Sequence, residues 1–195
     1  MKIIAIVQAR LGSVRLPEKV LKNIGGKPMI ELLLSRLSKS TLVDEIIVAT
    51  SEGTENDKLQ LLVESLGFSC IRGSEEDVLL RFYESAKQMN ADAVVRITGD
   101  CPLIDAEIID KCIKKFKKAS IDYVSNIEPA TFPDGLDVEV VSFKALEKAN
   151  INAISAFDRE HVTTYIRNSD NFLKSSVKHV EDLSKLRWTV DEQED

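Results

Sequence analysis

The chain has 195 residues, a formal net charge of −6 and 44% hydrophobic residues. This composition indicates one globular domain with a full core, and the acidic balance excludes a general nucleic-acid footprint. The longest apolar runs are too short to span a membrane and the N-terminus resembles a strand, not a signal peptide, so we expect a cytoplasmic protein without membrane contact. Three cysteines lack metal-site spacing, and we interpret them as buried hydrophobic residues in a reduced compartment: Cys70, Cys101 and Cys112.

Apolar runs alternate with amphipathic segments along the first 125 residues, and each pattern predicts an element. Strands are predicted at residues 3–7, 45–50, 68–71, 93–97 and 122–124. Helices are predicted at residues 28–38, 56–66, 75–89 and 105–118. This order favours an α/β fold with three α/β/α layers around a mainly parallel sheet, in which ligands bind beyond the carboxyl ends of the strands.

The pattern changes after about residue 125. Residues 136–140 alternate with a period of two, which predicts a half-exposed strand. Helices are predicted at residues 143–150 and 158–166, and a last strand at residues 187–190. We interpret this second half as a small β-containing insertion that packs on the same sheet, not as a separate domain.

The segment directly after the first strand carries the strongest functional signal. Gly12 and Ser13 allow backbone N–H groups to approach an anion closely. Arg10, Arg15 and Lys19 repel one another unless they share an anion, such as a nucleotide triphosphate. The segment lacks the dinucleotide and P-loop motifs, which disfavours a Rossmann dehydrogenase or a P-loop kinase. A surface loop with solvated cations is the alternative.

A carboxylate follows the strand predicted at residues 93–97. Gly99 lets the backbone turn there, and Asp100 then lies at the sheet edge where phosphates are expected. Carboxylate oxygens suit Mg²⁺, with waters and phosphate oxygens completing the shell. The alternative is that Asp100 caps the next helix, because Pro102 favours a turn.

Five segments together resemble the sugar nucleotidyltransferase superfamily. They are QARLGSVRLPEK at residues 8–19, GGKPM at 25–29, RGSEEDV at 72–78, RITGDCPLI at 96–104 and GLDVEV at 135–140. Within the superfamily, the chain is similar to the cytidylyltransferase branch, which includes the acylneuraminate and 3-deoxy-manno-octulosonate cytidylyltransferases. It most resembles the spore-coat polysaccharide protein F-like group. The resemblance covers essentially the whole chain, but its motifs do not specify one substrate.

The resemblance implies a Rossmann-like sheet of the nucleotide-diphospho-sugar transferase type. It also implies that the protein transfers CMP from CTP to a sugar or sugar acid, with release of pyrophosphate, in the biosynthesis of a surface polysaccharide such as that of a spore coat. Asp191 matches an aspartate that completes a Mg²⁺ site with Asp100 in related enzymes. Relatives are commonly dimers, so we expect a homodimer, and the strand at residues 136–140 is a candidate interface.

The resemblance also divides the single domain. We expect a nucleotide-binding half at residues 1–125, an insertion on the acceptor or dimer side at residues 126–186, and a last strand in residues 187–195 that returns to the sheet. Related sequences have a proline where Gln193 stands and continue into a helix, so we expect the chain to be truncated after this strand. An N-cap of a terminal helix is the alternative role for Asp191.

The expected site has three parts. Catalytic roles are expected for Arg10, Arg15, Lys19 and Asp100. Nucleotide binding is expected from Gln8, Ala9, Arg10, Gly12, Ser13, Arg15, Lys19, Ser51, Arg72, Gly73, Ser74, Asp77, Arg96 and Gly99. Acceptor binding is expected from Asp134, Asp137, Glu139 and His161.

Several of these side chains have structural alternatives. Arg72 and Arg96 can form salt bridges, and Ser74 and Asp77 can cap the helix near residue 75. The acids at residues 134–139 can form a solvated strand face, and a histidine such as that at position 161 is more commonly structural.

Two other functions stay open from the sequence. A glycosyltransferase of related fold would use a D-x-D pair, which Asp137-Val138-Glu139 matches only approximately. A non-catalytic nucleotide sensor or regulatory subunit would bind the nucleotide without turnover. The preference for CTP over other nucleotides rests on the resemblance alone.

Overall fold

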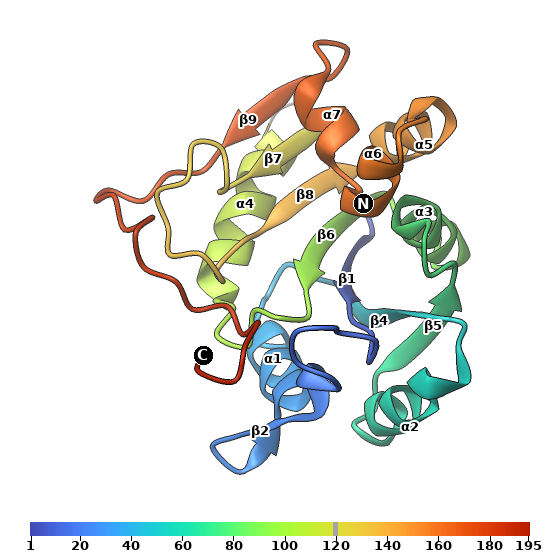
Figure 1. Cartoon of the computed structure of the whole chain (residues 1–195). Coiled ribbons are helices and arrows are strands. Elements are labelled where there is room, and N and C mark those ends of the chain that lie inside the picture. Colours follow the sequence, from blue (N-terminus) through green and yellow to red (C-terminus); the bar gives the residue numbers. More distant parts are fainter. Residues whose placement is uncertain (119–120) are drawn as a thin grey trace.

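A seven-stranded sheet runs through the centre of the computed structural model, which describes residues 1–118 and 121–195 (Figure 1). Its strand order is β5-β4-β1-β6-β8-β7-β9. The strands are β1 (Ile3–Gln8), β4 (Glu45–Ser51), β5 (Ser69–Gly73), β6 (Ala93–Thr98), β7 (Tyr123–Ser125), β8 (Glu139–Ser142) and β9 (Lys174–Ser176). The first four pair in parallel, whereas β8 runs antiparallel to both β6 and β7, and β9 is parallel to β7. The second half of the chain therefore extends the parallel sheet.

Helices cover both faces of the sheet, which confirms the three-layer α/β/α architecture (Figure 1). One face packs against α1 (Met29–Leu37), α2 (Asp57–Ser65) and α4 (Ala106–Lys118). The other face packs against α3 (Val78–Gln88), α5 (Phe143–Asn152) and α7 (Thr164–Asn168), with α6 (Ala156–His161) beside α3. Alternate residues of β1 enter the two cores, so its continuous apolar run fills both layers.

Short elements connect the larger ones. The segment after β1 contains the 3₁₀ helix η1 (Lys19–Leu21) and a small hairpin of β2 (Asn23–Ile24) and β3 (Lys27–Pro28), and η2 (Thr54–Asn56) precedes α2. The first four predicted helices are confirmed to within three residues. Cys101 and Cys112 are buried as expected, and Cys70 is half-buried. Within the described residues, every helix is too short or too polar to cross a membrane.

The strand predicted at residues 136–140 begins later and is not half-exposed. The observed strand is β8, and its first three residues are buried. The prediction is wrong because β8 lies between β6 and β7, with Val140 and Val141 packed into different cores. A period of two marks two faces of a strand, and here neither face meets water.

Two other predictions need correction. The helix predicted at residues 158–166 is interrupted at Val162 (φ 60°, ψ −58°), where the Thr163 N–H donates to the His161 carbonyl in a γ-turn. The segment at residues 187–190 is extended and bridges to Asp134 through Arg187, but it does not join the sheet. The last strand of the sheet is instead β9, which sequence reasoning missed because its Lys-Ser-Ser sequence has no apolar pattern.

Candidate active site

The carboxyl ends of β1 and β6 form a pocket of about 300 Å³. It is lined by Gln8, Ala9, Arg10, Gly12, Ser13, Val14, Arg15, Lys19, Val20, Thr98, Gly99 and Asp100. Gly99 lets the two strand ends meet, because its N–H donates to the Gln8 carbonyl at 2.8 Å and a Cβ there would also lie 2.8 Å from that oxygen. The structure thus brings the cationic loop (residues 8–19) together with Asp100, as the sequence predicts.

Lys19 links the two aspartates that the sequence analysis singled out. Its Nζ lies 3.3 Å from Asp100 Oδ2 and 3.0 Å from Asp191 Oδ1, and it donates to the Val190 carbonyl at 3.1 Å. Burial alone would raise the pKa of Asp191, but the hydrogen bond and charge of Lys19, followed by Arg187, hold that pKa below its ordinary value. Asp191 is therefore a stabilised carboxylate at the edge of the pocket.

The C-terminal segment brings Asp191 to this place without joining the sheet. The Val190 N–H donates to the Asp100 carbonyl at 2.9 Å, and the Trp188 N–H donates to the Asp134 carbonyl at 2.7 Å. Gly135 (φ 102°) is required beside this segment, because a Cβ there would lie 2.7 Å from the Trp188 carbonyl carbon. Arg15 also reaches Asp191 at 3.0 Å.

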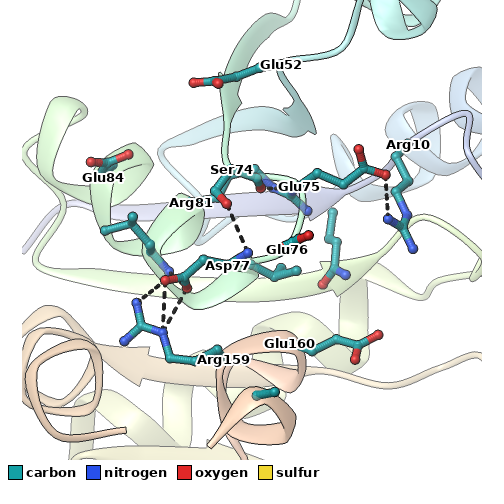
Figure 2. A pocket seen from close by; sticks show the side chains of 14 residues that line it. Arg10, Glu52, Ser74, Glu75, Glu76, Asp77, Arg81, Glu84, Arg159 and Glu160 are labelled. Atoms are coloured by element: carbon teal, nitrogen blue, oxygen red, sulfur yellow. Dashed lines mark hydrogen bonds and ion pairs between the residues drawn. The ribbon is translucent and has the colours of Figure 1, made fainter. Parts of the chain in front are cut away.

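A second pocket of about 1110 Å³ adjoins the first and shares Gln8 and Arg10 with it. Figure 2 shows its walls, which come from the turn before α3, from α3 itself and from α6. Arg10 Nη1 lies 2.9 Å from Glu75 Oε1 at the junction of the two pockets. On the far wall, Arg159 Nε donates to Asp77 Oδ1 and Oδ2 at 2.9 and 3.0 Å.

The turn before α3 is built around Arg81, a residue that sequence reasoning missed. Arg81 is 1% exposed and its Nη1 donates to the Ser74 carbonyl at 2.6 Å. Burial, and then the charge of Arg10, lower the pKa of Arg81 to about 10. A Cβ at Gly73 would lie 3.0 Å from Arg81 Cγ, so the glycine makes room for this side chain. Ser74 and Asp77 line the pocket but also take the predicted capping roles, since Ser74 Oγ accepts from the Asp77 N–H and Asp77 from the Leu80 N–H.

Asn56 is a second residue that sequence reasoning missed. It is fully buried, its Oδ1 accepts from the Leu11 N–H at 2.9 Å, and its Nδ2 donates to Ser51 Oγ at 2.8 Å. Asn56 therefore fixes the cationic loop to the start of α2. Ser51, expected to bind nucleotide, is buried and occupied by this contact. An asparagine before a helix is too common a pattern to have revealed the role.

Arg72 does not line either pocket. It points toward α2, where Nε donates to Gln60 Oε1 at 2.6 Å and Nη2 pairs with Asp57. Its neighbour Gly73 faces α3, and successive residues of a strand point to opposite faces. The salt-bridge alternative thus describes Arg72.

Arg96 and Glu139 form a buried pair on neighbouring strands. Their side chains are 15% and 3% exposed, and Glu139 also accepts from the hydroxyls of Tyr123 and Thr163. Burial would raise the pKa of Glu139, but Arg96 and these hydroxyls keep it below its ordinary value. Contrary to expectation, Glu139 is enclosed on all sides and faces no open surface.

The remaining acceptor candidates are scattered. Asp134 is exposed, and Asp137 is half-buried with its pKa raised to about 6 by burial and by the charges of Asp134, Glu139 and Asp100. His161 is exposed at the end of α6, with its ring edge-on to Phe157. Of these candidates, Asp137 therefore lies near Asp100, whereas His161 lies outside both pockets.

Taken together, a cationic loop and a facing carboxylate at the carboxyl edge of a mainly parallel sheet define a nucleotidyltransferase-type α/β protein. The model of the family described as "Cytidylyltransferase" matches residues 4–195, and the chain belongs to this family. This confirms the resemblance drawn from the sequence motifs.

The chain is similar to proteins that carry different functional descriptions. The chain is 45% identical over 194 residues to the uncharacterized protein MJ1063 of Methanocaldococcus jannaschii, covering 98% of this chain and 79% of the relative. It is 33% identical to the spore coat polysaccharide biosynthesis protein SpsF of Bacillus subtilis, covering 99% and 82%. It is 31% identical to 3-deoxy-manno-octulosonate cytidylyltransferase 2 of Hydrogenovibrio crunogenus, covering 93% and 68%.

Solved structures share the fold. A cytidylyltransferase from Leptospira borgpetersenii is 35% identical, with a TM-score of 0.96 that covers all of this chain and 83% of the other. A CMP:2-keto-3-deoxy-manno-octonic acid synthetase, solved in complex with CTP, has a TM-score of 0.77 at 18% identity, covering 100% and 95%. The three-layer fold expected from the sequence is thus the fold of these proteins.

Proposed function

We propose that this protein transfers CMP from CTP to a sugar or sugar acid, with release of pyrophosphate, in the biosynthesis of a surface polysaccharide. The observation that carries the proposal is the small pocket at the carboxyl end of β1. Arg10, Arg15, Lys19 and Asp100 line it, and Lys19 contacts both Asp100 and Asp191. The description of the relatives as cytidylyltransferases supports CTP as the nucleotide.

The cationic loop is suited to hold a triphosphate. Arg10 and Arg15 carry fixed charges on side chains that are 46% and 61% exposed, so a ligand can reach them. Gly12 and Ser13 line the same pocket and can offer backbone N–H groups. These groups would stabilise the charge that develops on pyrophosphate as it leaves.

The chemistry needs no covalent intermediate on the protein. An acceptor oxygen attacks the α-phosphorus of CTP, the bond to the β-phosphate oxygen breaks, and the proton of the acceptor hydroxyl passes to solvent or to a nearby carboxylate. The protein contributes by positioning both reactants and by stabilising negative charge. The half-buried Asp137, near Asp100, is a candidate contact for the acceptor.

The residues present fit a divalent cation. Asp100 and Asp191 both contact a single ammonium group, so the two carboxylates already share one positive charge between them. Within residues 1–118 and 121–195, no group of three His, Cys, Asp or Glu side chains could hold a metal ion. Phosphate oxygens and waters would therefore complete the shell around an ion held by the two carboxylates. Mg²⁺ held by Asp100 and Asp191 would neutralise phosphate charge and lower the pKa of the acceptor oxygen.

The larger pocket is the proposed place for the nucleoside. It adjoins the small pocket at Gln8 and Arg10, so a nucleotide whose phosphates lie at the cationic loop would extend its sugar and base toward Ser74 and Asp77. Its volume of about 1110 Å³ is large enough for a nucleoside together with part of an acceptor.

The test is the release of pyrophosphate. The protein is incubated with MgCl₂, CTP and a panel of sugars and sugar acids, with ATP, GTP and UTP in parallel. We expect pyrophosphate and a CMP-sugar with CTP and at least one acceptor. Consumption of a preformed CMP-sugar without pyrophosphate release would instead indicate a glycosyltransferase. Tight CTP binding by calorimetry without turnover on any acceptor would favour a nucleotide sensor.

A further inference from the structure

The ammonium group of Lys19 stands where a metal ion would be expected. It lies between Asp100 and Asp191, at 3.3 and 3.0 Å from their oxygens, and 3.1 Å from the Val190 carbonyl. A lysine ammonium has three N–H donors. All three are thus engaged by these oxygens, and Lys19 has no donor left for a phosphate.

The surroundings make this arrangement stable without a ligand. The side chains of Lys19, Asp191 and Asp100 are 14%, 19% and 29% exposed, so their charges are screened less than those on the open surface. Arg15 and Arg187 also reach Asp191, but within the described residues Lys19 alone contacts both aspartates.

We propose that Lys19 is an internal counter-ion that occupies the metal position in the nucleotide-free protein and moves to the triphosphate when the nucleotide binds. This inference rests on the proposed function, because it concerns the same pocket. The cationic loop that carries Lys19 also supplies Arg10 and Arg15, so a triphosphate bound there lies within the same pocket as the ammonium. The departure of Lys19 removes the one cation that Asp100 and Asp191 share, so the space between the two carboxylates can accept a metal ion.

The consequence is a coupling between the two ligands. Without nucleotide, a divalent cation must displace an ammonium held by three oxygens, so metal binding is weak. With nucleotide, Lys19 has a better partner and the carboxylate pair binds the metal. Such a coupling is reciprocal, and typical couplings change affinity by about 5- to 150-fold.

The test measures binding of Mn²⁺ to the nucleotide-free protein, with the electron paramagnetic resonance signal of unbound Mn²⁺ as the readout. We expect Lys19→Met to bind Mn²⁺ about 10-fold more tightly than the wild type. Lys19→Arg, which keeps the charge, should not gain affinity. Lys2→Met is the matched control, since Lys2 pairs with Glu45 at the opposite end of β1 and its loss also removes one positive charge.

Adding Asp100→Asn to Lys19→Met should abolish the gain, because one carboxylate is removed. Equal or weaker Mn²⁺ binding by Lys19→Met, or a gain that survives Asp100→Asn or appears equally in Lys2→Met, would overturn the inference. Lys19→Gln provides a second variant if Lys19→Met does not fold, as judged by circular dichroism. If the wild type releases pyrophosphate but Lys19→Met gains nothing, the coupling alone fails; a gain without pyrophosphate release means that the proposed function alone fails.

Discussion

Two clusters of charged side chains lie at neighbouring strand ends. Both consist of ion pairs, but they serve different purposes. Arg96 and Glu139 are enclosed, with 15% and 3% of their side chains exposed, and hydroxyl groups occupy the remaining oxygen of the glutamate. Lys19, Asp100 and Asp191 are also largely buried, but they border a pocket. Access, not charge, therefore separates a structural ion pair from a candidate catalytic group. A pair closed on all sides contributes to the fold, whereas a cluster with one open side can exchange a partner for a ligand.

The largest expected effect lies in the enclosed cluster. Arg96→Met leaves Glu139 as a buried carboxylate without its cation, which should lower the free energy of unfolding by about 3–5 kcal/mol. Chemical denaturation at pH 7 measures this loss. The double variant Arg96→Met/Glu139→Gln should recover most of the stability, since no unpaired charge is left. A loss below about 1 kcal/mol for the single variant would show that Glu139 is not dependent on Arg96.

Substitution of a cation in the small pocket should lower the activity of the protein rather than its stability. Arg15→Ala removes a cation from the small pocket and should lower kcat/KM for CTP by about 10²-fold or more, as expected for groups that stabilise developing charge. Arg72→Ala is the matched control, because Arg72 lines neither pocket and its side chain contacts Gln60 and Asp57. Steady-state pyrophosphate release compares the two. Equal losses of kcat/KM in both variants would show that the pocket arginine contributes no more to activity than an arginine that contacts α2.

Part of the candidate site could be predicted from the sequence, because parallel strands place the residues that follow them at one edge of the sheet. Asp100 and the cationic loop could be brought together in advance, because parallel strands end at one edge and both segments follow such strands. Asp191 was expected near them only through the resemblance, and it arrives on an extended segment bonded to the Asp100 carbonyl, not on a strand. Arg72 was misplaced because the pattern locates a residue along a strand but does not show what fills the space on its face.

Contacts between distant segments could not be predicted from the sequence. Arg81 and Asn56 act through backbone groups of Ser74 and Leu11, which any residue type offers, so no motif marks them. The break at Val162 has no glycine or proline to signal it, since a valine holds the positive φ. The period of two around Glu139 was present, but the sequence does not say that the polar face meets Arg96.

The next prediction concerns Asp137 and the pH dependence of the free energy of unfolding. Burial and neighbouring acids raise its pKa from 3.8 to about 6, so the folded protein holds this proton more tightly than the unfolded chain. Stability should therefore fall as the pH rises from about 4 to 6, and the full cost is present above 6. In EDTA, Asp137→Asn should be more stable than the wild type by about 1–3 kcal/mol at pH 7 and equally stable near pH 3.5. An Asn variant that is less stable at pH 7 would contradict the crowding of acids around Asp137.

The smallest effect concerns the Arg10–Glu75 pair at the junction of the two pockets. Both side chains are about half exposed, and such pairs contribute little. Glu75→Gln should make Arg10 available to the triphosphate and lower KM for CTP by about two- to fivefold, with kcat unchanged. Glu84→Gln removes the same charge from another wall of the larger pocket and serves as the control. A higher KM in Glu75→Gln would mean that Glu75 itself contacts the nucleotide.

The most direct measurement is a crystal structure with CTP and Mn²⁺, in which anomalous scattering locates the metal. We expect the Mn²⁺ peak between Asp100 and Asp191, the triphosphate against Arg10 and Arg15, and the Lys19 ammonium moved from the carboxylates to a phosphate oxygen. A triphosphate bound away from the cationic loop, or a metal peak remote from both aspartates, would contradict the proposed active site.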